Sequence, residues 1–200
     1  MIAILDYGSG NLRSAERAFA TSGLDVVVTA DRAVALEADG LVVPGVGAFA
    51  ACMKGLQSVD GASIIRERIA NERPVLGICI GMQILFREGS EHGENGNHAG
   101  VGVWEGEVSR LDAPILPHMG WNNVESDSNS TLFKGVAGES FYFVHSYAAK
   151  KAVGKMQGWS VHGEKFLSAV EDGYVSATQF HPEKSGDAGL ALIANWVKSL

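Results

Sequence analysis

A cysteine between two glycines is the feature of this sequence that best fits a chemical role. Cys79 lies at the centre of residues 77–81, after the apolar run 74–76 and before the helix-like pattern of residues 82–86. A glycine on each side lets the backbone take a strained strand-to-helix turn that a Cβ atom would block. Such a turn exposes the thiol and aims a helix N-terminus at it, which favours the thiolate. We therefore interpret Cys79 as a nucleophile, the alternative being a small buried side chain.

A base for this nucleophile occurs far downstream. His181 and Glu183 follow an apolar segment and are separated by Pro182, so at a strand end their side chains would point the same way. A carboxylate beside an imidazole fixes its tautomer and stabilises the imidazolium. We expect Cys79 to be the nucleophile, His181 the general acid and base, and Glu183 the group that orients His181. The alternative is a surface turn with an incidental ion pair.

Acyl transfer also requires hydrogen-bond donors for the oxyanion. The elbow itself offers the backbone N–H of Ile80. We expect the second donor from residues 44–47, at Val46 or Gly47, because ligands of parallel sheets bind beyond the carboxyl ends of the strands. Glycines on both sides of Val46 let its peptide planes rotate, so this loop can hold its N–H groups in or out of the site. A tight turn that needs two glycines is the alternative.

The elements that must position these groups begin with an alternation of strands and helices. Continuous apolar segments at residues 2–5, 26–28, 40–43 and 75–78 predict buried strands. Leu12, Ala15 and Phe19 mark one helical face between them, and Ile65 and Ile69 mark another. Buried strands separated by helices indicate a parallel sheet that is covered on both faces.

The second half of the chain has a different pattern. Its predicted strands are residues 103–111, 121–125, 141–147, 166–171 and 174–180, with connections too short for crossover helices. A final helix is expected after an N-cap at Ser185, with an apolar stripe formed by Leu190, Ile193, Val197 and Leu200. We therefore predict a single α/β domain over residues 1–200. It has an open, mostly parallel sheet flanked by helices, with additional antiparallel or mixed strands in its C-terminal half.

Composition excludes several functional classes. The chain has 200 residues, 46% of them hydrophobic and 20% charged, which describes an ordinary globular protein. Its net charge of −7, without a cluster of Lys or Arg, argues against a nucleic-acid partner. No apolar run approaches the length of a membrane span, and no signal peptide is apparent. We expect a cytoplasmic protein that binds neither nucleic acid nor membrane.

No metal or cofactor is expected. Only two cysteines occur, so there is no disulfide framework, and Cys52 is interpreted as helical core packing. Four histidines (His92, His98, His118 and His162) lack metal-ligand spacing. Residues 8–10 resemble the start of a nucleotide-binding loop, but Arg13 stands where the third glycine of that fingerprint belongs.

Five segments together carry a family resemblance: residues 44–49, 77–83, 117–122, 143–147 and 179–185. They resemble the glutaminase subunits of imidazole glycerol phosphate synthase, a family within the triad (class I) glutamine amidotransferases. The resemblance runs from the first strand to the last helix. The cysteine elbow and the His-Pro-Glu segment identify only the superfamily, whereas residues 44–49 and 117–122 are far more specific to this family.

The resemblance implies an activity and a partner. It implies hydrolysis of glutamine to glutamate and ammonia, which passes to a (βα)₈-barrel cyclase subunit in a heterodimer that forms imidazole glycerol phosphate in histidine biosynthesis. It places glutamine against Cys79. The family pattern lines the glutamine pocket with Gly47, Gln83, Glu91, Ser146 and Tyr147, and puts Asn11, Trp121, Tyr142 and Lys184 at or near the partner interface. Residue 14 is Ser where some members carry Asn, so it is assigned no interface role.

Three other functions fit the same residues less well. One is an amidotransferase subunit of another pathway, such as pyridoxal phosphate synthesis, which residues 117–122 disfavour. Another is a cysteine-dependent hydrolase that acts alone, which would be fully active without a partner. The third is a binding module that retains the fold without activity, and the presence of Cys79, His181 and Glu183 argues against it.

Overall fold

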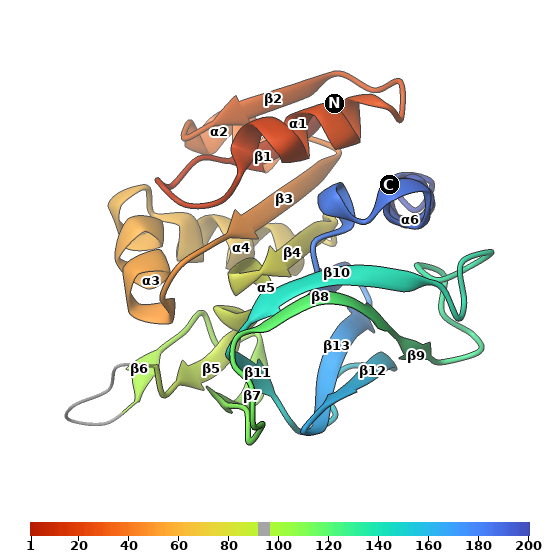
Figure 1. Cartoon of the computed structure of the whole chain (residues 1–200). Coiled ribbons are helices and arrows are strands. Elements are labelled where there is room, and N and C mark those ends of the chain that lie inside the picture. Colours follow the sequence, from red (N-terminus) through yellow and green to blue (C-terminus); the bar gives the residue numbers. More distant parts are fainter. Residues whose placement is uncertain (92–96) are drawn as a thin grey trace.

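An eight-stranded sheet runs through the molecule (Figure 1). The structure, a computed structural model, describes residues 1–91 and 97–200, so His92 lies outside the described residues. The strands of this sheet are β1 (Ile2–Leu5), β2 (Val26–Thr29), β3 (Gly40–Gly45), β4 (Val75–Cys79), β9 (Glu125–Ser126), β12 (Met156–His162), β13 (Glu164–Asp172) and β14 (Val175–Thr178). Their order is β2-β1-β3-β4-β14-β13-β12-β9. Pairing is parallel from β2 to β14 and antiparallel from β14 to β9, which confirms the predicted mixed α/β sheet.

The parallel part of the sheet is the apolar part of the sequence. Every residue of β1, β3 and β4 is buried, as expected for strands that are covered on both faces. The helices are α1 (Leu12–Ala20), α2 (Arg32–Glu37), α3 (Phe49–Ser58), α4 (Gly61–Ala70), α5 (Ile80–Gln83) and α6 (Gly186–Val197), with a short 3₁₀ helix η1 (Pro182–Lys184). Helix α1 packs against α6, and both α2 and α3 pack against α4. Among the described residues, none of these helices has the length and apolarity that crossing a membrane requires.

Two smaller sheets lie beside the main one (Figure 1). A two-stranded ribbon consists of β8 (His118–Asn123) and β10 (Ser140–His145). A four-stranded sheet consists of β11 (Tyr147–Ala149), β7 (Trp104–Arg110), β5 (Phe86–Gly89) and β6 (His98–Ala99). The predicted strand over residues 141–147 is in fact two strands that separate at Ser146. The sequence reading missed β5 and β12, whose residues alternate less regularly between apolar and polar types.

The predicted face of the last helix is only partly right, because Ile193 is buried and Leu190 and Val197 pack against the core, but the fully buried face is centred elsewhere. Helix α6 buries Leu192, Ile193 and Trp196, whereas Leu200 lies beyond the helix and is exposed. Trp196 meets the ring of Phe19 edge-on at 5.8 Å. The C-terminal segment is apolar on several sides, so periodicity does not single out one stripe. Ser185 does precede the helix, but its hydroxyl makes no capping hydrogen bond there.

Candidate active site

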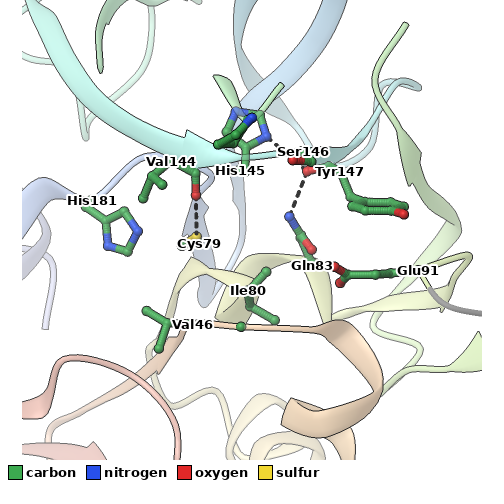
Figure 2. A pocket seen from close by; sticks show the side chains of 12 residues that line it. Val46, Cys79, Ile80, Gln83, Glu91, Val144, His145, Ser146, Tyr147 and His181 are labelled. Carbon is green, nitrogen blue, oxygen red and sulfur yellow. Dashed lines mark hydrogen bonds between the residues drawn. The ribbon is translucent and has the colours of Figure 1, made fainter. Parts of the chain in front are cut away.

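Three adjacent parallel strands end at the same edge of the main sheet. Strand β4 lies between β3 and β14, with Gly45 in register with Cys79 and Thr178 in register with Ile78. The residues that follow these strands therefore meet at one place, as the sequence predicted. A cavity of about 350 Å³ opens there (Figure 2). Its lining includes most of the predicted site residues: Val46, Gly47, Cys79, Ile80, Gln83, Glu91, Ser146, Tyr147 and His181.

Cys79 occupies a strained backbone conformation at the end of β4. Its φ of 57° and ψ of −112° are rare for a residue with a side chain. The flanking glycines permit this turn because neighbouring backbone atoms pack where their side chains would be. A Cβ atom on Gly81 would lie 1.8 Å from the carbonyl oxygen of Val43, and one on Gly77 would lie 2.7 Å from that of Gly81. The positive φ therefore belongs to the cysteine, and the glycines make room for it.

The helix expected after the elbow is much shorter than predicted. Helix α5 ends at Gln83, and Phe86 already begins β5. A single turn of helix has little macrodipole, so the sequence reading overstated this contribution to thiolate stability. Two other polar groups lie near the Cys79 sulfur: the Val144 carbonyl oxygen at 4.0 Å and the Gln179 side-chain nitrogen at 3.8 Å. No pattern in the sequence indicated a role for Gln179.

His181 and Glu183 form a buried pair. His181 Nδ1 lies 2.7 Å from Glu183 Oε1, and the two side chains are only 2% and 4% exposed. The expected strand geometry is wrong, because β14 ends at Thr178 and Glu183 lies in η1. The 3₁₀ turn, which begins with Pro182, brings the carboxylate back to the imidazole. His181 Nε2, on the other side of the ring, has no hydrogen-bond partner among the described residues.

The charges around His181 favour its protonated form. Burial disfavours the imidazolium, but the electrostatic and hydrogen-bond interactions with Cys79 and Glu183 outweigh this effect and raise the pKa of His181 to about 10. His181 therefore carries a proton throughout the neutral range. It lines the same cavity as Cys79, so the site combines a sulfur nucleophile with a proton donor.

The loop after β3 does not point its amide into the cavity. The Val46 N–H donates a hydrogen bond to Ser9 Oγ at 3.0 Å, and Ser9 Oγ donates to the Val46 carbonyl oxygen at 2.9 Å. Cys52 is buried on α3, as interpreted from the sequence, and its S–H donates to the same carbonyl at 3.3 Å. Gly47 has a φ of 94°, which favours glycine. Ile80, the other expected donor, begins α5 directly after Cys79. Ser9 lies in residues 8–10, the segment that resembles the start of a nucleotide-binding loop in sequence.

Four of the expected glutamine-binding residues, Gln83, Glu91, Ser146 and Tyr147, lie at the far end of the cavity from His181 (Figure 2). Gln83 Nε2 donates to the Tyr147 carbonyl oxygen at 2.8 Å and to Gln179 Oε1 at 3.0 Å. Gln83 Oε1 is buried and has no hydrogen-bond partner among the described residues. Glu91 Oε2 accepts a hydrogen bond from the Phe49 amide at 2.8 Å, which fixes one carboxylate oxygen.

The expected interface residues are distributed over several elements. Trp121 lies on strand β8, which begins three residues before the strand predicted over residues 121–125, and its side chain is 60% exposed. Its ring meets that of Tyr142, on the paired strand β10, at 6.1 Å. Asn11 caps α1, which packs against η1, where Lys184 lies.

Histidines do not gather into a metal site in residues 1–91 and 97–200, where no group of three His, Cys, Asp or Glu side chains is placed to hold one. His118 instead stacks on His162 at 4.3 Å and on Phe143 at 4.8 Å. His118 Nδ1 lies 2.9 Å from His145 Nε2, and His145 also lines the cavity. No pattern in the sequence indicated a role for His145.

Comparisons with known proteins agree with this geometry. The family described as "Glutamine amidotransferase class-I" matches residues 3–200. The imidazole glycerol phosphate synthase subunit HisH of Nocardia farcinica is 59% identical, over 100% of this chain and 98% of the relative. The HisH subunit of Mycobacterium bovis is 58% identical over the same shares.

Solved structures share the fold at low identity. A crystal structure titled as a glutamine amidotransferase has a TM-score of 0.72 at 18% identity, covering 96% of this chain and 98% of its own. The structure of PurLQS from Thermotoga maritima has a TM-score of 0.67 at 19% identity, covering 99% of this chain and 97% of its own. The chain therefore belongs to the class I glutamine amidotransferases and, within that class, to the family of imidazole glycerol phosphate synthase subunit HisH.

Proposed function

We propose that this protein hydrolyses glutamine to glutamate and ammonia and supplies the ammonia to a cyclase subunit in histidine biosynthesis. The observation that carries the proposal is one cavity that holds the Cys79 thiol and His181, itself paired with a buried Glu183. The names of the relatives at 58–59% identity support imidazole glycerol phosphate as the product of the complex. A thiol nucleophile that must stay reduced also favours a cytoplasmic location.

In the first half of the reaction, Cys79 as a thiolate, with its proton on His181, attacks the side-chain carbonyl carbon of glutamine through Sγ. A C–S bond forms, and the π electrons move to the carbonyl oxygen, where the N–H of Ile80 and a donor from residues 46–47 stabilise the charge. The oxyanion then collapses and the C–N bond breaks. His181 gives its proton to the departing nitrogen, so that ammonia leaves and a thioester remains.

In the second half, water replaces ammonia. His181 takes a proton from a water molecule as its oxygen attacks the thioester carbon. The C–S bond breaks, glutamate leaves and the thiolate is regenerated. Glu183 holds the His181 ring by its Nδ1 atom throughout, which directs Nε2 to the reacting groups.

Groups at the end of the cavity far from His181 would bind the α-ammonium and α-carboxylate groups of the substrate. The Glu91 carboxylate suits the ammonium group, and backbone N–H groups at Ser146 and Tyr147 suit the carboxylate. The unpaired acceptor Gln83 Oε1 adds a site for an N–H donor of glutamine. Gly47 offers backbone close to the reacting carbonyl.

The partner would be a (βα)₈-barrel cyclase that docks over Trp121, Tyr142, Lys184 and Asn11 in a heterodimer. The exposure of Trp121 supports this face, because a large exposed aromatic is typical of an interface centre. The bond from the Val46 amide to Ser9 supports a dependence on the partner, since that amide is turned away from the cavity. One missing oxyanion donor lowers kcat by about 10²–10³.

The decisive experiment measures glutamate release by the free chain and by its complex with the cyclase, for the wild type and for Cys79→Ala. We expect strong activation by the liganded cyclase and no glutamine hydrolysis by Cys79→Ala. The Cys79→Ala complex should still form product from added ammonium salts, because that chemistry lies on the cyclase. Glutamine turnover near wild type in Cys79→Ala would exclude the proposed nucleophile. Equal turnover of free chain and complex would indicate a hydrolase that acts alone.

A further inference from the structure

A line of hydrogen-bonded side chains connects the β8–β10 ribbon with the cavity. Asn122 Nδ2 lies 3.2 Å from His118 Nε2, and His118 Nδ1 lies 2.9 Å from His145 Nε2. His145 Nδ1 lies 3.0 Å from the carbonyl oxygen of Tyr147. His118 and His145 are each only 5% exposed and face each other across the ribbon in register.

The direction of every bond in this line follows from its two ends. A carbonyl oxygen only accepts, so His145 must carry its hydrogen on Nδ1. Burial lowers the pKa of His145 to about 3, so the ring is neutral and its Nε2 is an acceptor. His118 Nδ1 must then donate to it. Burial also lowers the pKa of His118 to about 4, which leaves Nε2 of that ring to accept from Asn122.

The Asn122 end is fixed independently. Its Nδ2 group also lies 3.0 Å from the carbonyl oxygen of Val161, which again only accepts. Both hydrogens of the Asn122 amide are therefore committed, one to Val161 and one to His118. The hydrogen bonds run in one direction from Asn122 to Tyr147, and no group in the line can be reversed alone.

At the cavity end the line reaches a substrate-facing group. The Tyr147 carbonyl accepts from both His145 Nδ1 and Gln83 Nε2, which sets the orientation of the Gln83 amide. Figure 2 shows His145 and Gln83 directed at this segment from opposite sides. The remaining oxygen of Gln83 is buried in the cavity lining without a partner among the described residues.

At the other end the line reaches the proposed docking face. Side chains alternate along β8, so His118 and Asn122 lie on its inner side while Met119 and Trp121 point outward. Met119 is 62% exposed and Trp121 is 60% exposed. A partner that presses on the outer side of β8 therefore acts on the strand that carries His118.

We propose that His118 and His145 are positioning residues that couple the outer face of the β8–β10 ribbon to the glutamine pocket. They do so by fixing the Tyr147 carbonyl and, through it, the Gln83 amide. The inference rests on the proposed function, because it assumes that glutamine binds beside Gln83 and that the cyclase docks over Trp121. Breaking the line weakens glutamine binding and the response to the partner, without weakening the partner's binding.

Four variants separate this role from simple packing. Both His118→Phe and His145→Phe keep an aromatic ring in the stack with Phe143 and remove every ring nitrogen. His145→Asn places an amide N–H near the position of Nδ1, so it retains the bond to the Tyr147 carbonyl and loses the link to His118. The matched control is His162→Phe. His162 stacks on His118 and hydrogen-bonds to the carbonyl oxygen of Ile115, but it lies outside the line.

The readouts are the KM for glutamine, the activation ratio of complex over free chain, and the Kd for the cyclase. For His145→Phe we expect KM to rise about five- to tenfold, the effect of one lost hydrogen bond to an oriented group. His118→Phe and His145→Asn should lower the activation ratio by about the same factor with smaller changes in KM. The cyclase Kd, the ammonium-dependent reaction and all values for His162→Phe should match the wild type.

The outcomes distinguish this inference from the function on which it rests. A wild-type complex that does not hydrolyse glutamine would overturn the proposed function itself. An active wild type with all three histidine variants unchanged in KM and activation would overturn the coupling alone. In the wild type, nitrogen-15 shifts of the imidazole rings should show both His118 and His145 as neutral rings with the hydrogen on Nδ1. The opposite tautomer at either ring would also overturn the coupling.

Discussion

The amide nitrogen of Val46 donates a hydrogen bond to the hydroxyl oxygen of Ser9 at 3.0 Å. These residues follow the adjacent strands β3 and β1, so the bond joins two loops at the active edge of the sheet. The sequence predicted that this N–H stabilises the oxyanion. In the structure, the bond directs it toward Ser9 instead. Turning that peptide toward the cavity requires the loss of this bond.

Ser9→Ala should therefore raise glutamine turnover by the free chain. Removing an acceptor worth about 1 kcal/mol gives about a fivefold increase. The liganded complex should change little, because its loop has already turned, so the activation ratio falls. The measurement is glutamate release with and without the cyclase, and the control is Ser58→Ala, which removes a hydroxyl bonded to the Gly55 carbonyl on α3. Unchanged or slower turnover of the free Ser9→Ala chain would contradict a restraining role.

Glu183→Gln should shift the pH profile in a direction set by charge. The carboxylate helps to raise the pKa of His181 to about 10, so His181 is protonated below that pH and loses its proton above it. The wild-type kcat for glutamate release should therefore decline only as the pH approaches about 10. Glutamine at position 183 keeps the shape but not the charge, so the pKa falls and the decline begins at lower pH.

The control for this shift is Glu164→Gln, which alters an ion pair with Lys150 away from the cavity. Its pH profile should match the wild type. Glu183→Gln should also reduce kcat less than His181→Ala, since the proton carrier remains. A profile for Glu183→Gln with an unchanged basic limb would show that the carboxylate does not set the His181 pKa.

Arg68 gives a prediction about stability. Its guanidinium is fully buried and donates to the carbonyl oxygens of five residues. Three lie at the C-terminal end of α2 (Ala35, Leu36 and Ala38), and the other two come directly before β3 (Asp39) and β4 (Pro74). Arg68→Met removes the donor that these carbonyls share, although the carbonyl of Ala38 keeps a bond from Arg73 and that of Pro74 keeps one from the Leu41 amide. Losing the rest of this network should lower the free energy of unfolding by about 3–5 kcal/mol. Urea unfolding of the free chain measures it.

The matched control is Arg66→Met on the same helix. Arg66 is exposed and hydrogen-bonds to one carbonyl oxygen, that of Val101. We expect a loss of about 1 kcal/mol there. Equal losses for the two arginines would mean that the buried carbonyls at α2 gain little from Arg68.

The sequence was sufficient for the parallel half of the fold, because buried strands such as β1 and β4 consist of uninterrupted apolar residues. It was insufficient where apolar residues surround an element, as in α6, or where polar residues interrupt it, as in β12. There, the buried face depends on which neighbour packs against the element, as Trp196 does against Phe19. Such contacts between distant segments leave no local periodicity.

The same distinction applies to the site. The roles proposed for Cys79, His181 and Glu183 follow from residue type and local spacing, so the sequence pattern alone was enough to propose them. It was not enough for Ser9 and His145. Ser9 matters because β1 and β3 are adjacent, and His145 matters because β10 pairs with β8 in a register that sets it opposite His118. Only the paired strands reveal these partners.

Replacing Trp121 tests whether this side chain contributes to partner binding or to the stability of the fold. Its side chain is 60% exposed on β8 and contacts the ring of Tyr142 on β10. Replacing it with alanine removes little buried packing, so Trp121→Ala should melt close to the wild-type temperature. A central aromatic of an interface contributes about 2 kcal/mol or more to binding, so the Kd for the cyclase should rise about thirtyfold.

The comparison variants for Trp121→Ala are Tyr174→Ala and Lys184→Ala. Tyr174 is 44% exposed and directly precedes β14, so it lies at the end of the strands that is far from the cavity. Its replacement should therefore leave cyclase binding unchanged. Lys184 lies beside the buried His181–Glu183 pair in η1, and we expect its replacement to weaken binding less, with an effect that diminishes at high salt. The measurement is a titration of the cyclase against each variant together with a thermal melt of the free chain. If Trp121→Ala melts far lower while its cyclase Kd is unchanged, the ring stabilises the ribbon and the partner docks elsewhere.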